Sequence, residues 1–215
     1  SLYGSNAVGG AVNFITARPS ATPEVNLGVR SEAVTGYRRV DTGASNTWGD
    51  LGVRFSHYSS RRSENNWQQY SNGDKDSATL RGDYVLDGSS LLHAVYTYSN
   101  LDSATPGSLN PADYEADPGK SYQTFSWRKD KTMRLSLGWE GETLDNGLTS
   151  ATLFTRRNDH GQLPNYMISK CTSTGLPGDP CPTGYRGTLN NNAVESLGMD
   201  IKHQQDFAML SSRLI

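Results

Sequence analysis

SLYGSNAVGGAVNFIT, residues 1–16, opens the sequence and contains no charged side chain. Gly9 and Gly10 allow positive φ and close approach of the backbone, so this pair predicts a tight turn or a bulge. The residues after it, 11–16, have the composition of a short buried strand. On spacing alone, a glycine turn before a core strand suits many α/β and all-β proteins, because short glycine motifs have low specificity.

The order of residues in this stretch resembles the end of the plug domain of TonB-dependent outer-membrane receptors. The resemblance rests on residues 2–5, 7–10 and 12–16, and its motif residues are Tyr3, Gly4, Gly9, Gly10 and Asn13. In that family the segment ends a globular plug, and the chain then becomes the first strand of a large transmembrane β-barrel. The resemblance implies a plug end at 1–16, a linker at 17–23 and the N-terminal part of a barrel at 24–215.

Most of a plug is missing from this sequence, and so is the N-terminal box that touches the energy-coupling protein. We therefore expect the chain to be an internal fragment. Only 34% of its 215 residues are hydrophobic, which is a low fraction for a soluble globular protein. The net charge is −2. The aromatic residues and patterned strands argue against disorder. The absence of a basic stripe gives nucleic-acid binding little support.

Alternation of apolar and polar residues recurs along the chain from Glu24 onward. It is clearest where Met133, Leu135, Leu137 and Trp139 point one way and polar residues point the other. Similar segments lie at 24–30, 51–59, 78–86, 91–98, 148–157, 193–203 and 208–215. The segment 37–46 is polar and a poor strand by itself. The pattern predicts roughly nine strands.

Short and long connections alternate between these segments. Short turns are predicted at Trp48–Asp50, Asp87-Gly88, Asp145–Gly147 and near Asp206, and long loops at 61–75, 101–126 and 159–192. The connection near Thr35-Gly36 is short and departs from the pattern. Up-and-down strands with short turns at one end and long loops at the other are typical of outer-membrane barrels.

The predicted fold class is therefore all-β, an antiparallel up-and-down transmembrane β-barrel. The chain forms about nine strands of a barrel that has about 22 in plugged transporters. No run of about 18 apolar residues exists, so no transmembrane helix is predicted. Apolar rows would face lipid and charged rows the lumen, because lipid cannot hydrogen-bond the backbone. Tyr96, Tyr98 and Trp139 are predicted at strand ends as girdle aromatics, with ordinary sheet packing as the alternative.

Cys171 and Cys181 are the only cysteines, and both lie in the longest predicted loop. A disulfide between them would contribute roughly 3 kcal/mol by loop entropy, and it would indicate an oxidising compartment. The two cysteines do not predict a metal site, because there is no second cysteine pair and His160 alone adds too few ligands. No nucleophile elbow, phosphate loop or zinc helix motif is present. The sequence therefore predicts no enzyme, no metal and no cofactor.

The resemblance implies a receptor that takes up a scarce solute, most often a ferric siderophore. The ligand docks between the plug apices and the extracellular loops, and the TonB complex then pulls on the plug. The implied partners are outer-membrane lipid, TonB and a small metal chelate, in the outer membrane of a Gram-negative bacterium. The alternatives are a soluble, secreted all-β binding or adhesion module and, less favoured, a secreted β-rich hydrolase.

Arginine and aromatic side chains in the long loops are the candidate ligand contacts. Arginine pairs with anionic chelates, and aromatic faces stack on catechols and other rings. The alternative is that most of these residues are solvated loop residues or girdle aromatics. The candidates are Arg61, Arg62, Trp67, Tyr70, Tyr122, Trp127, Arg128, Arg156, Arg157, His160 and Tyr166.

Overall fold

The computed structural model describes residues 16–64, 67–122, 124–143, 147–164, 168–170, 185–207 and 212–214. Several predictions fall outside these residues. They are the plug-end motif (Tyr3, Gly4, Gly9, Gly10 and Asn13), the disulfide between Cys171 and Cys181, and the candidate ligand contact Tyr166. These stay predictions.

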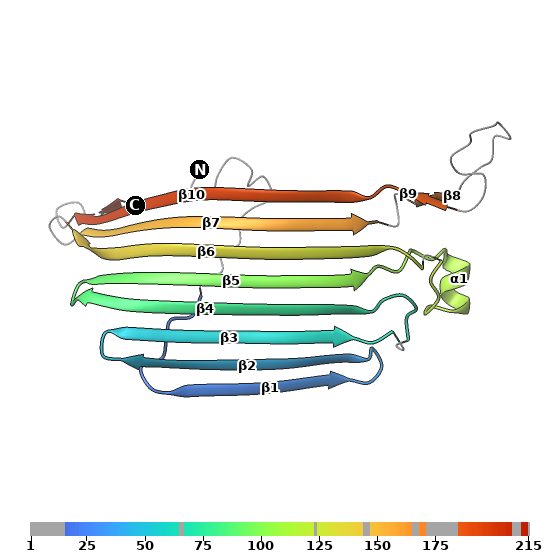
Figure 1. Cartoon of the computed structure of the whole chain (residues 1–215), viewed down its shortest axis with the longest axis horizontal. Helices are drawn as coiled ribbons and strands as arrows, with labels where there is room; N and C mark the ends of the chain where they lie inside the picture. The colour runs from blue at the N-terminus through green and yellow to red at the C-terminus, as the bar shows by residue number, and fades with distance from the viewer. Residues whose placement is uncertain are drawn as a thin grey trace.

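The described chain forms one antiparallel sheet in which neighbours in sequence are neighbours in space (Figure 1). Its order is β1-β2-β3-β4-β5-β6-β7-β10-β11. The strands are β1 Glu24–Glu32, β2 Tyr37–Trp48, β3 Leu51–Arg62, β4 Gly73–Asp87, β5 Ser90–Ala104, β6 Trp127–Thr143, β7 Gly147–Leu163, β10 Asn190–Phe207 and β11 Ser212–Leu214. A small hairpin, β8 Ile168–Lys170 with β9 Tyr185–Gly187, and one helix, α1 Pro111–Ala116, lie in the long connections.

Short turns lie at one end of the sheet and the longer loops at the other (Figure 1). The turn between β2 and β3 has only two residues, and Gly49 supplies the positive φ of 58° that its first position requires. In the turn between β4 and β5, Asp87 accepts a hydrogen bond from the backbone N–H of Ser89 at 3.0 Å. This bond, with those from the Ser90 and Ser89 hydroxyls, holds the pKa of Asp87 below its ordinary value. The predicted asymmetry of turns and loops is confirmed.

The two faces of the sheet differ in chemistry because successive side chains point to opposite sides. One face, which we call the apolar face, carries Leu135 and Leu137, which are 40% and 51% exposed. On the same face Leu197 is 75% exposed. Among the described residues Val95 is the only buried hydrophobic side chain. The described sheet therefore has no hydrophobic core of its own, and no second layer packs on its apolar face.

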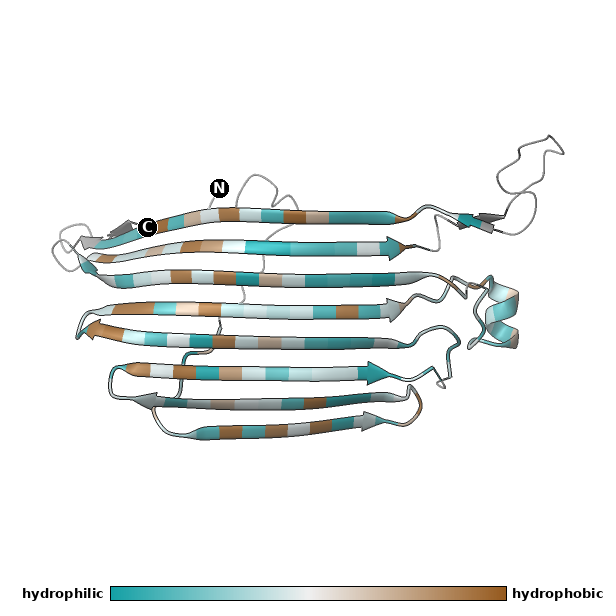
Figure 2. Cartoon of the chain, in the orientation of Figure 1, coloured by the Kyte–Doolittle hydropathy of each residue, from teal (hydrophilic) through white to brown (hydrophobic). Residues whose placement is uncertain are grey.

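Apolar residues gather toward the short-turn end of the strands, and the loop ends are hydrophilic (Figure 2). The strands accordingly run further than the apolar alternation predicted. Residues at the ends of the predicted loops belong instead to the strands β3, β4, β5, β7 and β10. For example, β7 continues to Leu163 and β10 begins at Asn190. The reason is that ladder pairing continues wherever the register holds, whatever the hydropathy of the side chains.

The polar segment 37–46, a poor strand by itself, is a full strand because it pairs on both sides with β1 and β3. One further expectation is corrected. Tyr96 and Tyr98 lie inside β5, which continues to Ala104, so they mark the edge of the apolar part and not the end of a strand. β10 ends at Phe207, next to the turn predicted near Asp206, and residues 208–211 lie outside the described part of the chain. No helix in the described part of the chain is long and apolar enough to cross a membrane.

Candidate functional site

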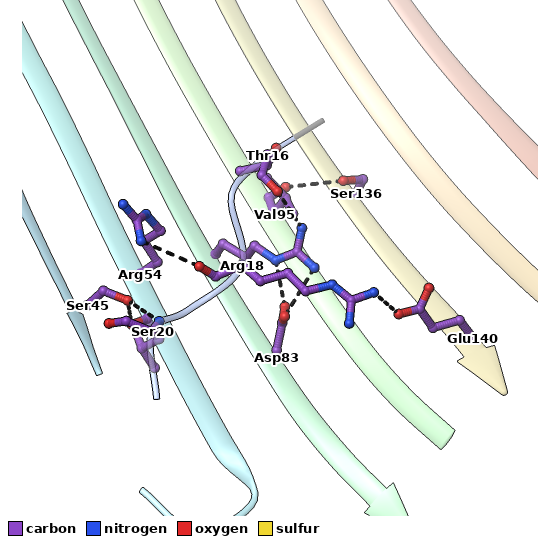
Figure 3. A network of polar contacts seen from close by, with 11 residues as sticks. Thr16, Arg18, Ser20, Ser45, Arg54, Asp83, Val95, Ser136 and Glu140 are labelled. Atoms are coloured by element: carbon purple, nitrogen blue, oxygen red, sulfur yellow. Dashed lines mark hydrogen bonds and ion pairs between the residues drawn. The ribbon is translucent and has the colours of Figure 1, made fainter. Parts of the chain in front are cut away.

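The second face, which we call the polar face, carries one continuous set of polar side chains. The register places Arg54 beside Arg81 and Arg134 beside Arg156 on this face. The linker 16–23 lies against this face and crosses several of its strands (Figure 3). The predicted separation of apolar and charged rows onto opposite faces is therefore confirmed for the central strands.

Arginines of the polar face hold the linker through its carbonyl oxygens. Arg81 Nη1 donates to the carbonyl of Thr16 at 3.1 Å, and Arg54 Nη1 donates to the carbonyl of Arg18 at 3.5 Å. The Arg18 side chain in turn reaches across to Glu140 of β6 and forms an ion pair (Figure 3). The linker is therefore held by strands from β3 to β6.

Hydroxyl groups fix the next part of the linker. The backbone N–H of Ser20 donates to Ser45 Oγ at 2.8 Å, and Thr47 Oγ1 donates to the carbonyl of Ser20 at 2.8 Å. Pro19 packs beside Gly52, where an added Cβ would lie 2.8 Å from the Cβ of Pro19. A glycine at 52 is thus needed for the linker to approach the sheet this closely.

Arg81 and Asp83 form the most buried ion pair among the described residues. Arg81 Nε and Nη2 donate to the two carboxylate oxygens of Asp83 at 2.7 Å and 3.1 Å, and the two side chains are 9% and 10% exposed. The linker and the strands enclose a recess of about 460 Å³ here, with His93 and Arg134 also on its wall. The bidentate geometry fixes the Arg81 guanidinium so that its remaining nitrogen points at the linker.

A basic and aromatic cluster lies on the polar face toward the loop end. We call Arg30, Arg39, Tyr58, Arg62 and Lys75 the Tyr58 cluster. The Arg39 guanidinium carbon lies 4.1 Å from the centre of the Tyr58 ring, and Lys75 Nζ lies 5.7 Å from it. The register pairs Arg30 with Arg39 across β1 and β2. Four cations from four adjacent strands thus share one region.

The sequence prediction included Arg62 but missed the other members of the Tyr58 cluster. Arg30, Arg39 and Tyr58 lie in segments that were predicted as strands, and Lys75 lies in the predicted loop 61–75 but was not among the candidates. A signal was present for one pair: a short turn at 33–36 makes residues 30 and 39 cross-strand partners. The sequence held no such signal for the pairing of β4 with β3, because the ten-residue loop 63–72 between them does not set a register.

The structure divides the predicted strand residues between the two faces. Arg62, Arg128, Arg156 and His160 are on the polar face, in register with its other members. Three others are on the opposite face. They are Arg61, which lies 4.0 Å from Asp74; Trp127, whose ring faces the ammonium of Lys129; and Arg157, which pairs with Asp159 and Glu195. The structure does not bring these three together with the others, because strand parity points them away.

The predicted loop residues Trp67, Tyr70 and Tyr122 are 50%, 43% and 49% exposed. Their loops touch each other: the backbone N–H of Gln69 donates to the carbonyl of Gly119 at 2.8 Å. Tyr122 contacts Lys120, whose Nζ lies 4.9 Å from the ring centre. The loops 63–72 and 105–126 therefore form one surface above the sheet.

A second polar group occupies the loop-end part of β6 and β7. Asp130 accepts hydrogen bonds from His160 and from Arg128, the latter at 2.5 Å. Burial alone would raise the pKa of Asp130, but the hydrogen bonds from His160 and Arg128 outweigh it and hold that pKa below its ordinary value. Two of the predicted contacts, Arg128 and His160, are thus already bound to one carboxylate. No group of His, Cys, Asp or Glu within the described ranges has the arrangement of a metal site.

No protein-family model matches the sequence, and no curated protein matches it. Solved structures do match. The ferric citrate transporter FecA in its unliganded form superposes with a TM-score of 0.76 at 19% identity, over 95% of this chain and 29% of that one. The chain has the fold of part of FecA.

The open form of the ferric-catecholate import receptor Fiu from E. coli K12 superposes with a TM-score of 0.66 at 12% identity. This match covers 89% of the chain and 32% of Fiu, so the chain spans about a third of the length of each solved relative. At these identities the likeness concerns the fold. It confirms the prediction of an antiparallel up-and-down sheet that is part of a barrel, as in TonB-dependent receptors.

Proposed function

We propose that the chain is part of a TonB-dependent receptor that imports a ferric chelate across the outer membrane of a Gram-negative bacterium. One observation carries the proposal. The sheet is a single layer with an uncovered apolar face, and its other face is polar and carries the linker. A soluble sandwich covers such an apolar face with a second sheet, and the described residues provide none.

The apolar face suits lipid in both chemistry and dimensions. The apolar row of β4 runs from Ala78 to Leu86, which matches the about ten residues that a tilted strand needs to cross a bilayer. The polar strand ends beyond this row, such as Trp127–Lys131 of β6, would then lie outside the hydrocarbon. From Ala78 to Tyr84 the strand is paired with β3 on one side and β5 on the other, as lipid requires, and the register shifts only beyond it, between Val85 and Asp87.

The polar face suits a lumen that a plug fills. Its arginines and carboxylates already hold the chain segment that follows the predicted plug end. The plug-end motif and the fold likeness support the same family from independent directions. We therefore assign the chain no catalytic step, and its partners are outer-membrane lipid, TonB and a ferric chelate. The disulfide between Cys171 and Cys181 stays part of the proposal.

The ligand would meet the loop end of the polar face and the loops above it. The sequence-predicted residues that fit this site are Arg62, Trp67, Tyr70, Tyr122, Arg128, Arg156 and His160. Arg61, Trp127 and Arg157 do not fit it, since they lie on the apolar side of the sheet.

Fractionation and titration test the proposal together. The full-length receptor should sediment with outer membranes and need detergent for extraction. In detergent, its tryptophan fluorescence should be quenched in a saturable manner by at least one ferric chelate. Recovery in the aqueous phase without detergent would favour the secreted binding module instead. Extraction with detergent but no response to any chelate would contradict the proposed cargo and would still support the barrel.

A further inference from the structure

We propose that the Tyr58 cluster selects anionic ferric chelates, whose carboxylate or catecholate oxygens carry net negative charge, over neutral hydroxamate chelates. The inference rests on the proposed function and names the substrate class of that site. It follows from the charge, the shape and the fixed geometry of the cluster.

The cluster carries an excess of positive charge. Near the cluster, the loop-end half of β1 and β2 contributes two carboxylates to the polar face, Asp41 and Glu32. Asp41 is bound to Arg39, whose Nε lies 2.9 Å from both carboxylate oxygens, and Glu32 accepts from Thr35 Oγ1 at 2.7 Å. Asp74 is on the opposite face, beside Arg61. Lys75 and Arg62 have no ion-pair partner in the described part of the chain.

Three of the four cations, Arg39, Arg62 and Lys75, line a recess of about 360 Å³. Tyr37, Tyr58 and Ser60 also line it, and Asp74, which lies 4.0 Å from Arg61, is the carboxylate on its wall. Three cations and the hydroxyls of tyrosine and serine thus converge on one space at the loop end, where they outnumber this carboxylate. Such a set donates hydrogen bonds to anionic oxygens, and charge-assisted hydrogen bonds are stronger than neutral ones. A neutral chelate would have to displace water from these cations without compensating charge.

Tyr58 gives the cluster a fixed geometry before any ligand arrives. Its ring contacts both Arg39 and Lys75, and Asp41 holds the other side of the Arg39 guanidinium. Cations held in this way lose less conformational freedom on binding than free side chains do. Lys75 combines this positioning with free donors, because Tyr58 contacts it and no carboxylate pairs with it among the described residues.

The test compares three probes on the full-length receptor in detergent: ferric citrate, a ferric tricatecholate and a neutral ferric trihydroxamate. Fluorescence quenching gives Kd for each probe with wild type, Lys75→Gln and Arg62→Gln. The control is Lys129→Gln, which removes the same charge on the opposite face, where Lys129 pairs with Asp102 at 2.8 Å. We expect Lys75→Gln to raise Kd about tenfold for an anionic probe, the loss of one charge-assisted hydrogen bond. The control should stay within about twofold.

Two results would overturn the inference while sparing the receptor function. One is tight binding of the neutral probe in preference to both anionic probes. The other is binding of an anionic probe with Kd unchanged in both cluster variants, or in Arg62→Gln if Lys75→Gln does not fold. Failure of all three probes to bind wild type would remove the proposed cargo and the inference with it.

Discussion

At the scale of single residues, the pairing of Arg81 with Asp83 should be the most sensitive contact of the polar face. Replacing Asp83 with Ala leaves a guanidinium that is 9% exposed without its carboxylate. We expect a loss of about 3 kcal/mol in the free energy of unfolding, because an unpaired buried charge is costly. Urea unfolding of the receptor in detergent measures it.

Asp200 provides a matched control for this prediction. It is also on the polar face and pairs with the residue two positions along its strand, Lys202, at 3.4 Å. Both side chains are more than half exposed, at 58% and 52%. Asp200→Ala should therefore cost less than about 1 kcal/mol. Equal losses for the two variants would contradict the importance of burial at Asp83.

The sequence showed which face each of these residues takes but not which partners they meet. Strand alternation puts Arg81 and Asp83 on one face, and the same parity places Glu140 among the polar row of β6. The contact of Glu140 with Arg18 spans 122 residues and depends on where the linker lies, which no local pattern encodes. For the same reason the Tyr58 cluster was missed, since its cations meet only through the pairing of four strands.

At the scale of the elements, the tight turn between β2 and β3 should depend on the conformation of Gly49. A Cβ at Gly49 would meet no atom within 4 Å, so any cost of Gly49→Ala comes from its φ of +58°. We expect about 1 kcal/mol of destabilisation. Gly88 also has open space around it but needs no positive φ. Gly88→Ala should thus change the free energy of unfolding by less than about 0.5 kcal/mol in the same urea titration, and an equal cost at both turns would contradict the argument.

The contact between the two loops gives a second prediction at this scale. A Cβ on Gly119 would collide with the carbonyl oxygen of Trp67, so Gly119→Ala should separate loop 105–126 from loop 63–72. The Gln69 amide, which donates to the Gly119 carbonyl, should then exchange its hydrogen about tenfold faster. Hydrogen exchange with mass spectrometry measures this, with Gly88→Ala as the control at the other end of the sheet. Unchanged exchange at Gln69 would contradict the loop contact.

The elements also show why strand lengths were underestimated. Alternation of apolar residues ends near Met133 in β6, but the strand begins six residues earlier at Trp127. Hydropathy reports what surrounds a strand, whereas pairing depends on the neighbouring backbone. The helix α1 was missed although it has a local signal: Asn110 caps it by accepting from the Asp113 N–H at 2.9 Å, and Pro111 follows.

At the scale of the whole molecule, the number of strands in the main sheet and the asymmetry of the connections were predictable because each strand pairs with its neighbours in sequence. The hairpin of β8 and β9, which lies within the predicted loop 159–192, was not predicted. The order β1 to β7 needs no crossover, so turn positions alone determine it. The alternation of apolar and polar residues does not show what covers each face of the sheet. A sandwich and a membrane barrel share alternation, and they differ in whether anything packs on Leu137 and Leu197, which are 51% and 75% exposed.

The last prediction separates these two environments within one pair of adjacent residues. Leu153 lies on the apolar face between Leu137 and Met199, and it is 48% exposed. In a bilayer, Leu153→Arg places a charge against hydrocarbon and should cost about 2–4 kcal/mol near the midplane. Its neighbour Thr152 is on the polar face, opposite Asp200. Thr152→Arg adds the same side chain where water and a carboxylate are available, so folding into lipid vesicles should change little.

The folded fraction of the receptor in vesicles, measured against urea, distinguishes the two variants. A large loss for Leu153→Arg with a small one for Thr152→Arg means that hydrocarbon meets the apolar face and water meets the polar face. The reverse order would mean that the polar face is the one packed in a dry environment, and the barrel assignment of the two faces would be wrong. Equal tolerance of both arginines would mean that neither face contacts hydrocarbon or a packed protein layer, because either one makes the cost of an arginine depend on the side to which it points.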